Sequence, residues 1–215
     1  MRYKAVIFDI DGTVTDHISS WRYIHERLGL WEELAHRYQK EFLAGKISYR
    51  KFCELDAAHW KGMREEKIRR IFAGARYSKN AKASIKKLKQ AGFKLIAIST
   101  GLQYMAERVK SEMGFDYVLS NRLMVKKGIL TGGVRINIAH GAKGFMLKKI
   151  LKRFGLTCRQ AIGVGDSAGD IPMAREAGYF IAFNSTDKAL SDMADYNSRT
   201  RDLREVTDKI LSVSS

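Results

Sequence analysis

The chain has 215 residues, of which 45% are apolar and 29% charged, a balance typical of a folded globular protein with a sizeable core. Its single proline and the lack of Ser/Gly/Pro-rich tracts argue against a disordered linker, and no apolar run approaches the roughly 20 residues that span a bilayer. The two cysteines match no metal-binding or redox spacing, so we expect reduced thiols in a cytoplasmic protein.

The charge balance is unusual, because 39 basic and 23 acidic residues give a net charge of +16. Such a charge admits nucleic-acid binding. The lysines, however, lie on the polar faces of predicted amphipathic helices, and aromatic residues do not alternate with them as a base-stacking platform requires. We therefore favour a positive field that attracts small phosphorylated molecules, and we keep a basic nucleic-acid-binding protein as a less favoured alternative.

Four short apolar runs, at residues 5–8, 95–98, 161–164 and 179–182, have the continuous pattern of strands that are buried on both faces. Amphipathic helical patterns separate them, and three of these helices end at Gly92, Gly114 and Gly155, the residue type that accepts the left-handed conformation of a helix C-terminus. The alternation predicts an α/β fold with a doubly wound, Rossmann-like parallel sheet. Residues 121–135, with turns at 127–128 and 132–133, add a predicted β-hairpin.

Residues 16–75 interrupt this alternation. They contain helical patterns and no strand-like run. We interpret them as a small helical cap domain inserted directly after the first strand, and residues 1–15 and 76–215 as the Rossmann-like core domain. An insert at this place lies over the carboxyl ends of the strands, where open α/β sheets bind their ligands.

Polar side chains stand at the carboxyl ends of three predicted strands, which meet at one edge of a parallel sheet. They are Asp9 and Asp11 after the first strand, Ser99 and Thr100 after the second, and Asp166 and Asp170 after the third. Two carboxylates at positions i and i+2 project to the same side of an extended chain. Such a cluster of negative charge needs a cation, and carboxylates with room for water are typical of Mg²⁺ sites.

Lys143 is predicted near the start of a helix, where the helix dipole disfavours a cation. We therefore expect another partner for its ammonium group, either a phosphoryl group or the Asp9 carboxylate. Ser99 and the free N–H groups at the start of the helix after it are candidates for holding the remaining phosphoryl oxygens.

Four motifs, taken in order along the chain, resemble those of the haloacid dehalogenase superfamily. They are Asp9-Ile10-Asp11-Gly12-Thr13, Ser99-Thr100-Gly101, Lys143, and Gly165-Asp166-Ser167-Ala168-Gly169-Asp170. The resemblance covers nearly the whole chain and is strongest to the phosphoserine phosphatase branch, through Ser99 and residues 120–123 and 142–144. That branch carries a helical cap of the C1 type directly after its first motif.

The resemblance implies a Mg²⁺-dependent phosphatase that works through an aspartyl-phosphate. Asp9 would attack phosphorus, and Asp11 would protonate the leaving group and then deprotonate the hydrolytic water. The implied metal-binding residues are Asp9, Asp11 through its main-chain carbonyl, Asp166 and, nearby, Asp170, and the implied phosphate-binding residues are Ser99, Thr100 and Lys143.

The chain departs from this branch in the predicted cap. An alignment without gaps puts Ile18 where phosphoserine phosphatases have the acidic residue for the substrate amine, and Asp56 where they have the arginine for the substrate carboxylate. Gly169 replaces the asparagine of the fourth motif. A substrate other than phosphoserine therefore becomes a serious candidate. The residues expected to line the cap side of the site are His17, Trp21, Arg22 and Tyr49.

We accordingly predict a cytoplasmic phosphoric monoester hydrolase that acts on a small phosphorylated metabolite and has no membrane partner. The sequence does not determine the oligomeric state, and a homodimer is one alternative. The alternative is a phosphotransferase that passes the aspartyl-phosphate to a second alcohol. The sequence does not distinguish hydrolysis from phosphotransfer, because exclusion of water from the intermediate depends on how the cap closes.

Overall fold

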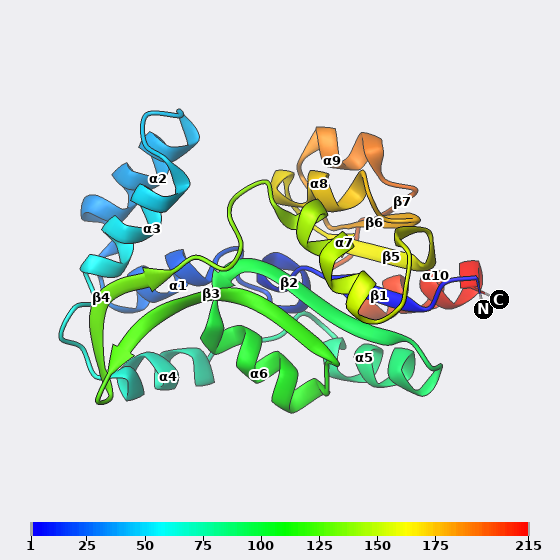
Figure 1. The fold of residues 1–215 in the computed structure, drawn as a ribbon, viewed down its shortest axis with the longest axis horizontal. Helices are drawn as coiled ribbons and strands as arrows, with labels where there is room; N and C mark the ends of the chain where they lie inside the picture. Colours follow the sequence, from blue (N-terminus) through cyan, green and yellow to red (C-terminus); the bar gives the residue numbers. More distant parts are fainter. Residues whose placement is uncertain (1, 215) are drawn as a thin grey trace.

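A single seven-stranded sheet organises the chain (Figure 1), whose computed structural model describes residues 2–214 apart from the side chains of residues 33 and 34. The strand order is β4-β3-β2-β1-β5-β6-β7, and all neighbours are parallel except β3 and β4. The strands are β1 (Ala5–Phe8), β2 (Lys94–Leu102), β3 (Tyr117–Lys126), β4 (Ile129–Arg135), β5 (Ala161–Gly165), β6 (Tyr179–Phe183) and β7 (Tyr196–Ser198).

Helices cover both faces of this sheet, which confirms the predicted doubly wound α/β fold (Figure 1). They are α1 (Ser20–Arg27), α2 (His36–Leu43), α3 (Tyr49–Ala58), α4 (Glu65–Ala73), α5 (Ala81–Gln90), α6 (Gln103–Met113), α7 (Lys143–Arg153), α8 (Ile171–Ala174), α9 (Lys188–Met193) and α10 (Leu203–Ser214). Within residues 2–214, no helix has the length and apolar character needed to cross a membrane.

Strand β1 shows why the sheet needs helices on both sides. Its four residues are all buried. Val6 and Phe8 belong to an apolar cluster that includes residues of α5, α6 and α10, whereas Ala5 and Ile7 belong to a second cluster with residues of α7, α8 and α9. Because successive side chains of a strand point to opposite faces, a run with no polar residue is stable only between two covering layers.

The direction in which strands are added reverses next to β1. Strands β2 and β3 are added on one side of it, and β5, β6 and β7 on the other. In an open parallel sheet, the carboxyl ends of the strands at such a reversal border a crevice. Asp9 directly follows β1 and therefore stands in this crevice, between the ends of β2 and β5.

The predicted hairpin is present, but it is longer than expected and one of its predicted turns is wrong. Strand β3 pairs first with β2 in parallel and then with β4 in antiparallel orientation. The turn at Lys127 and Gly128 has φ of 50° and 74°, as a two-residue hairpin loop requires. Gly132 and Gly133 lie inside β4 instead, where the pairing register shifts and Gly132 has φ of 80°. The glycine pair therefore forms a bulge within the strand.

Helices α1–α4 gather at the end of the molecule opposite α10 (Figure 1). The segment after α3 pairs with the hairpin, since the amide of Gly62 donates to the Leu130 carbonyl and the amide of Leu130 donates to the Met63 carbonyl, both at 2.9 Å. Trp60 and Phe72 join the same apolar cluster as β1. These helices thus share a core with the sheet, while the division into a cap at 16–75 and a core domain stays a prediction.

Replacing Trp60 by alanine tests that shared core. The side chain is fully buried and stacks on Trp21 at a centroid distance of 5.8 Å. We expect Trp60→Ala to lower the free energy of unfolding by about 3–5 kcal/mol, because a large cavity is left in a packed region. Urea denaturation followed by circular dichroism measures it. Leu43→Ala, at a residue that is 72% exposed, is the control and should change stability by less than about 0.5 kcal/mol; equal effects would contradict the shared core.

Candidate active site

One lysine ammonium group lies between two carboxylates in the crevice beside β1. Lys143, the first residue of α7, places Nζ 2.8 Å from Asp9 Oδ1 and 2.6 Å from Asp170 Oδ1. All three side chains are buried. The contact with Asp170 is a hydrogen bond, whereas the contact with Asp9 is an ion pair without hydrogen-bond geometry. The fold therefore brings the lysine to the residue expected to be the nucleophile.

Asp170 organises the loop that follows β5. Its Oδ2 accepts hydrogen bonds from the amides of Asp166 at 3.0 Å and Ser167 at 3.2 Å, and its Oδ1 accepts from Lys143. The side chain is fully buried and both of its oxygens have partners within the protein. Asp170 consequently holds Lys143 and the Asp166 backbone in fixed positions relative to each other.

The turn after Asp9 carries Asp11 across the end of the sheet. Residues Ile10–Val14 form one wide turn, in which Gly12 has φ of 80°. A Cβ atom on Gly12 would lie 2.4 Å from Asp166 Oδ2, so both the backbone conformation and the available space require glycine. The Thr13 hydroxyl donates to Asp166 Oδ1 at 3.1 Å. These contacts lock the first motif to the loop after β5.

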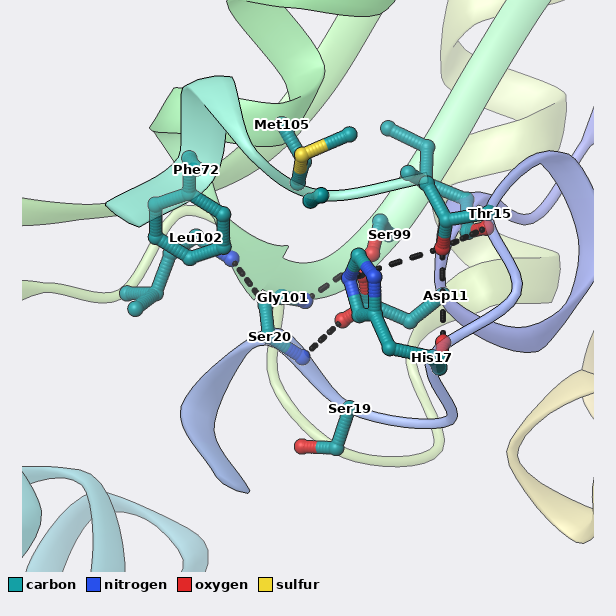
Figure 2. Close-up of polar contacts among 12 residues, drawn as sticks. Asp11, Thr15, His17, Ser19, Ser20, Phe72, Ser99, Gly101, Leu102 and Met105 are labelled. Carbon is teal, nitrogen blue, oxygen red and sulfur yellow. Dashed lines mark hydrogen bonds and ion pairs between the residues drawn. The ribbon is translucent and has the colours of Figure 1, made fainter. Parts of the chain in front are cut away.

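Two donors hold the Asp11 carboxylate, as Figure 2 shows. The amide of Ser20 lies 2.7 Å from Oδ2, and Nε2 of His17 lies 3.1 Å from Oδ1. Burial alone would raise the pKa of Asp11, but the hydrogen bonds from His17 and Ser20 lower it below its ordinary value. The ionised form of Asp11, which can act as a base, is therefore stabilised.

The end of β2 forms another wall of the site. The strand runs to Leu102, further than predicted, so Ser99 and Thr100 lie within it. The Ser99 hydroxyl is buried and accepts from the amide of Gly101 at 3.0 Å, which leaves its hydrogen for another acceptor. A Cβ atom on Gly101 would lie 2.4 Å from Asp11 Oδ2. Glycine at this position thus allows β2 to approach Asp11 directly (Figure 2).

Three side chains donate to the main-chain carbonyl of Thr100. The donors are Trp21 Nε1 at 3.1 Å, Tyr49 Oη at 3.0 Å and Asn121 Nδ2 at 3.0 Å. Trp21 comes from α1, Tyr49 from α3 and Asn121 from β3. Of the predicted cap-side residues, Trp21 and Tyr49 therefore reach the segment next to Ser99.

Asn121 has a role that sequence reasoning missed. Its Oδ1 accepts hydrogen bonds from the amides of Asn137 at 2.9 Å and Ile138 at 3.0 Å, while its Nδ2 also donates to Tyr49 Oη at 2.9 Å. A single buried amide therefore connects four segments that are distant in the sequence. No local pattern signals such a residue, because each of its partners is brought there by the fold.

The other cap-side residues have different surroundings. Arg22 Nε donates to Glu26 at 2.6 Å and its guanidinium lies over the Trp31 ring, so a role for Arg22 at the substrate stays a prediction. Ile18 is 68% exposed and brings no charge. Asp56 is 1% exposed, and its Oδ1 lies 3.3 Å from His25 Nε2. Asp56 is therefore engaged in a buried pair inside the helical segment.

The buried cluster holds more negative than positive charge. One oxygen each from Asp9, Asp166 and Asp170 lie within 4.8 Å of one another. Burial raises the pKa of Asp9 well above its usual range, and burial together with the Asp170 carboxylate raises the pKa of Asp166 to about 7. Burial alone would lower the pKa of Lys143, but Asp170 and Asp9 raise it. An excess of carboxylate oxygens at this spacing fits a hard divalent cation.

A cavity of about 560 Å³ opens beside the cluster. Its lining includes Gly12 and Asp166 together with the basic residues Arg76, Lys79 and Arg201. Asp9, Ser99 and Lys143 are not among the residues that line it. The cavity therefore reaches the Asp166 side of the cluster.

Comparison with known proteins agrees with this geometry. Residues 6–175 match the model of the haloacid dehalogenase-like hydrolase family. The phosphoserine phosphatase of Methanocaldococcus jannaschii is 32% identical over 204 residues, which are 94% of this chain and 95% of that protein. The phosphoserine phosphatase of Streptococcus thermophilus is 31% identical over 179 residues, covering 83% of this chain and 82% of the relative. A solved structure described as a phospho-aspartyl intermediate analogue of phosphoserine phosphatase superposes with a TM-score of 0.84 at 31% identity, covering 97% of this chain and 99% of the other.

The fold and the buried carboxylate–lysine site define a hydrolase of the α/β class, and the chain belongs to the haloacid dehalogenase-like hydrolase family. Within the family it is similar to the phosphoserine phosphatases over nearly its whole length. The predicted family and the predicted enzyme class, a phosphatase, are thereby confirmed.

The raised pKa of Asp166 predicts how the stability of the metal-free protein depends on pH. Between the ordinary pKa of 3.8 and about 7, the folded state retains a proton that the unfolded chain has lost. The protonated Asp166 carboxyl group therefore contributes fully to stability below pH 3.8, and this contribution is lost as the pH rises to about 7. We expect the free energy of unfolding in EDTA to fall more steeply over this range for the wild type than for Asp166→Asn, measured by urea denaturation. Parallel profiles for the two proteins would contradict the shift.

Proposed function

We propose that the chain hydrolyses a small phosphomonoester through a covalent phosphate on Asp9. The observation that supports this most strongly is the buried contact of Asp9 with Lys143, 2.8 Å apart, beside the carboxylates of Asp166 and Asp170. A carboxylate next to a buried ammonium group can attack a phosphoryl group while the same cation neutralises the phosphoryl oxygens.

The proposed reaction has two steps. In the first, which starts with Asp11 in its protonated form, an Asp9 oxygen bonds to phosphorus, the ester P–O bond breaks, and Asp11 gives its proton to the departing alkoxide. In the second, water attacks the same phosphorus, Asp11 takes a proton from that water, and the bond to Asp9 breaks to release inorganic phosphate. The Ser99 hydroxyl and Lys143 Nζ bind the phosphoryl oxygens in both steps, whereas the amides of Gly101 and Leu102 donate to the hydroxyls of Ser99 and Ser20.

A Mg²⁺ ion would be held by the carboxylates of Asp9 and Asp166 and by the main-chain carbonyl of Asp11. The hydrogen bonds of Asp170 to Lys143 and to two amides support a different role for that residue, which is to position the ligands and the lysine. When bound, the ion supplies charge neutralisation at the phosphoryl group.

The residues on the cap side of the site support a substrate other than phosphoserine. The name of the relatives makes phosphoserine the first compound to test. However, exposed Ile18 has no charge for an amine, and buried Asp56 pairs with His25. We propose a small phosphorylated metabolite, recognised mainly through its phosphoryl group. The predicted cytoplasmic location and the possible homodimer stay predictions.

Replacing the nucleophile tests the proposed chemistry. Asp9→Asn should lower the hydrolysis of p-nitrophenyl phosphate with Mg²⁺ by at least about 10⁴-fold, because an amide cannot form the covalent intermediate. EDTA should abolish the wild-type activity. Asp192→Asn, at an exposed carboxylate of α9 that pairs with Lys188, is the matched control and should keep full activity. Turnover by Asp9→Asn at the wild-type rate would overturn the assignment.

A comparison of substrates tests the proposed preference. We expect kcat/KM for phosphoserine to be no more than about tenfold above that for glycerol 2-phosphate, since one missing charge-assisted hydrogen bond costs about 1.5–3 kcal/mol. Phosphoethanolamine, which has the amine without the carboxylate, separates the two missing contacts. A preference for phosphoserine of several hundredfold would show that other residues recognise its amine and carboxylate.

Phosphotransfer remains the alternative to hydrolysis. Both activities begin with the same phosphate on Asp9 and differ only in the acceptor. Inorganic phosphate and phosphorylated product are measured with and without added glycerol. Product phosphate equal to the alcohol released indicates hydrolysis, whereas a lasting deficit of phosphate in the presence of glycerol indicates transfer.

A further inference from the structure

We propose that His17 is a positioning residue of this enzyme, which orients the Asp11 carboxylate by donating a hydrogen bond from Nε2. The inference rests on the proposed function and adds a residue outside the four matched motifs. His17 lies on the connection between the turn Ile10–Val14 and α1 (Figure 2).

The Asp11 carboxylate needs external donors to fix its plane. The last torsion of an aspartate side chain has a broad energy profile, so rotamer preference alone leaves the carboxylate free to turn. His17 binds Oδ1 at 3.1 Å and the Ser20 amide binds Oδ2 at 2.7 Å. Because each donor holds a different oxygen, rotation of the carboxylate breaks both hydrogen bonds. Loss of His17 leaves Oδ1 without this donor.

The imidazole ring is itself held in place. It is stacked on the Tyr23 ring of α1, with centroids 4.8 Å apart and an interplanar angle of 29°, and its side chain is 8% exposed. The hydroxyl of Thr15, which donates to the Ile10 carbonyl at 3.0 Å, lies 3.3 Å from the His17 carbonyl and 3.5 Å from Nε2. The ring therefore presents Nε2 to Asp11 without having to be ordered when substrate binds.

The hydrogen-bond inventory locates the donor hydrogen of His17. An ionised carboxylate can only accept, so the hydrogen must lie on Nε2. Within residues 2–214, the buried Nδ1 has no hydrogen-bond partner. The hydrogen bond to Asp11 therefore assigns a hydrogen to Nε2.

The consequence for catalysis depends on the leaving group. An alkoxide must receive its proton as the ester bond breaks, so its departure requires a correctly placed Asp11, and small misplacements of a catalytic group can cost up to about 100-fold. A nitrophenolate departs without protonation. Misorientation of Asp11 should therefore slow alkyl phosphates and spare p-nitrophenyl phosphate in the first step, which kcat/KM reports.

The test compares His17→Leu, which fills the space without a donor, with His17→Gln, whose side-chain amide can place an N–H near the position of Nε2. We expect His17→Leu to lower kcat/KM for glycerol 2-phosphate by about 10–100-fold and for p-nitrophenyl phosphate by less than about threefold. His17→Gln should recover at least about a third of the wild-type value for glycerol 2-phosphate. His36→Leu, at a histidine of α2 that packs on Trp31, controls for loss of a histidine and should match the wild type with both esters.

Three outcomes overturn the inference. They are equal losses for the two esters in His17→Leu, no recovery in His17→Gln, or an effect confined to KM. Thermal unfolding of each variant shows that the comparison is made on folded protein. Failure of the inference is distinct from failure of the proposed function, because the latter would appear as activity that persists in Asp9→Asn with His17 intact.

Discussion

Two buried carboxylates, Asp9 and Asp170, share one buried ammonium group at the end of β1, with the partly buried Asp166 beside them, and the rest of the structure is arranged around this charge imbalance. Lys143 neutralises part of it through Asp9 and Asp170, and Asp166 lies close to both carboxylates. Isolated buried charges are costly in a protein interior, so such a cluster requires either protons or a cation. The raised pKa values of Asp9 and Asp166 show that, without a cation, these carboxyl groups retain protons more readily than usual. The same imbalance that destabilises the metal-free cluster makes it suitable for binding a cation.

The topology concentrates this charge at one place. Asp9, Ser99 and Asp166 belong to segments at the ends of β1, β2 and β5, which are neighbours in the sheet although they are far apart in the chain. Glycine at positions 12 and 101 then allows main chain and carboxylates to approach within distances that a Cβ atom would forbid. The glycines of the motifs therefore matter for the close packing of the site as much as the polar residues matter for its charge.

The helical segment is coupled to strand β2 by hydrogen bonds to a single carbonyl group. Trp21 and Tyr49 reach the Thr100 carbonyl from α1 and α3, and Asn121 reaches it from the core. A displacement of these helices would therefore break hydrogen bonds to the Thr100 carbonyl, next to Ser99. On the cap side, Ile18 brings no charge and Asp56 pairs with His25. One fold commonly serves several substrates when its sites differ in such residues.

The sequence by itself determined the fold class and the chemical residues. Short continuous apolar runs between helical patterns are typical of strands buried on both faces, and the four motifs place Asp9, Asp11, Lys143 and Asp166 at predictable points of such a sheet. It misjudged Gly132 and Gly133, because a glycine pair is equally compatible with a turn and with a bulge until the partner strand is known. Only the tertiary structure decided what surrounds the Asp11 carboxylate. The roles of His17 and Asn121 depend on partners from separate segments, and a side chain acquires such a role only when folding brings donor and acceptor to hydrogen-bonding distance.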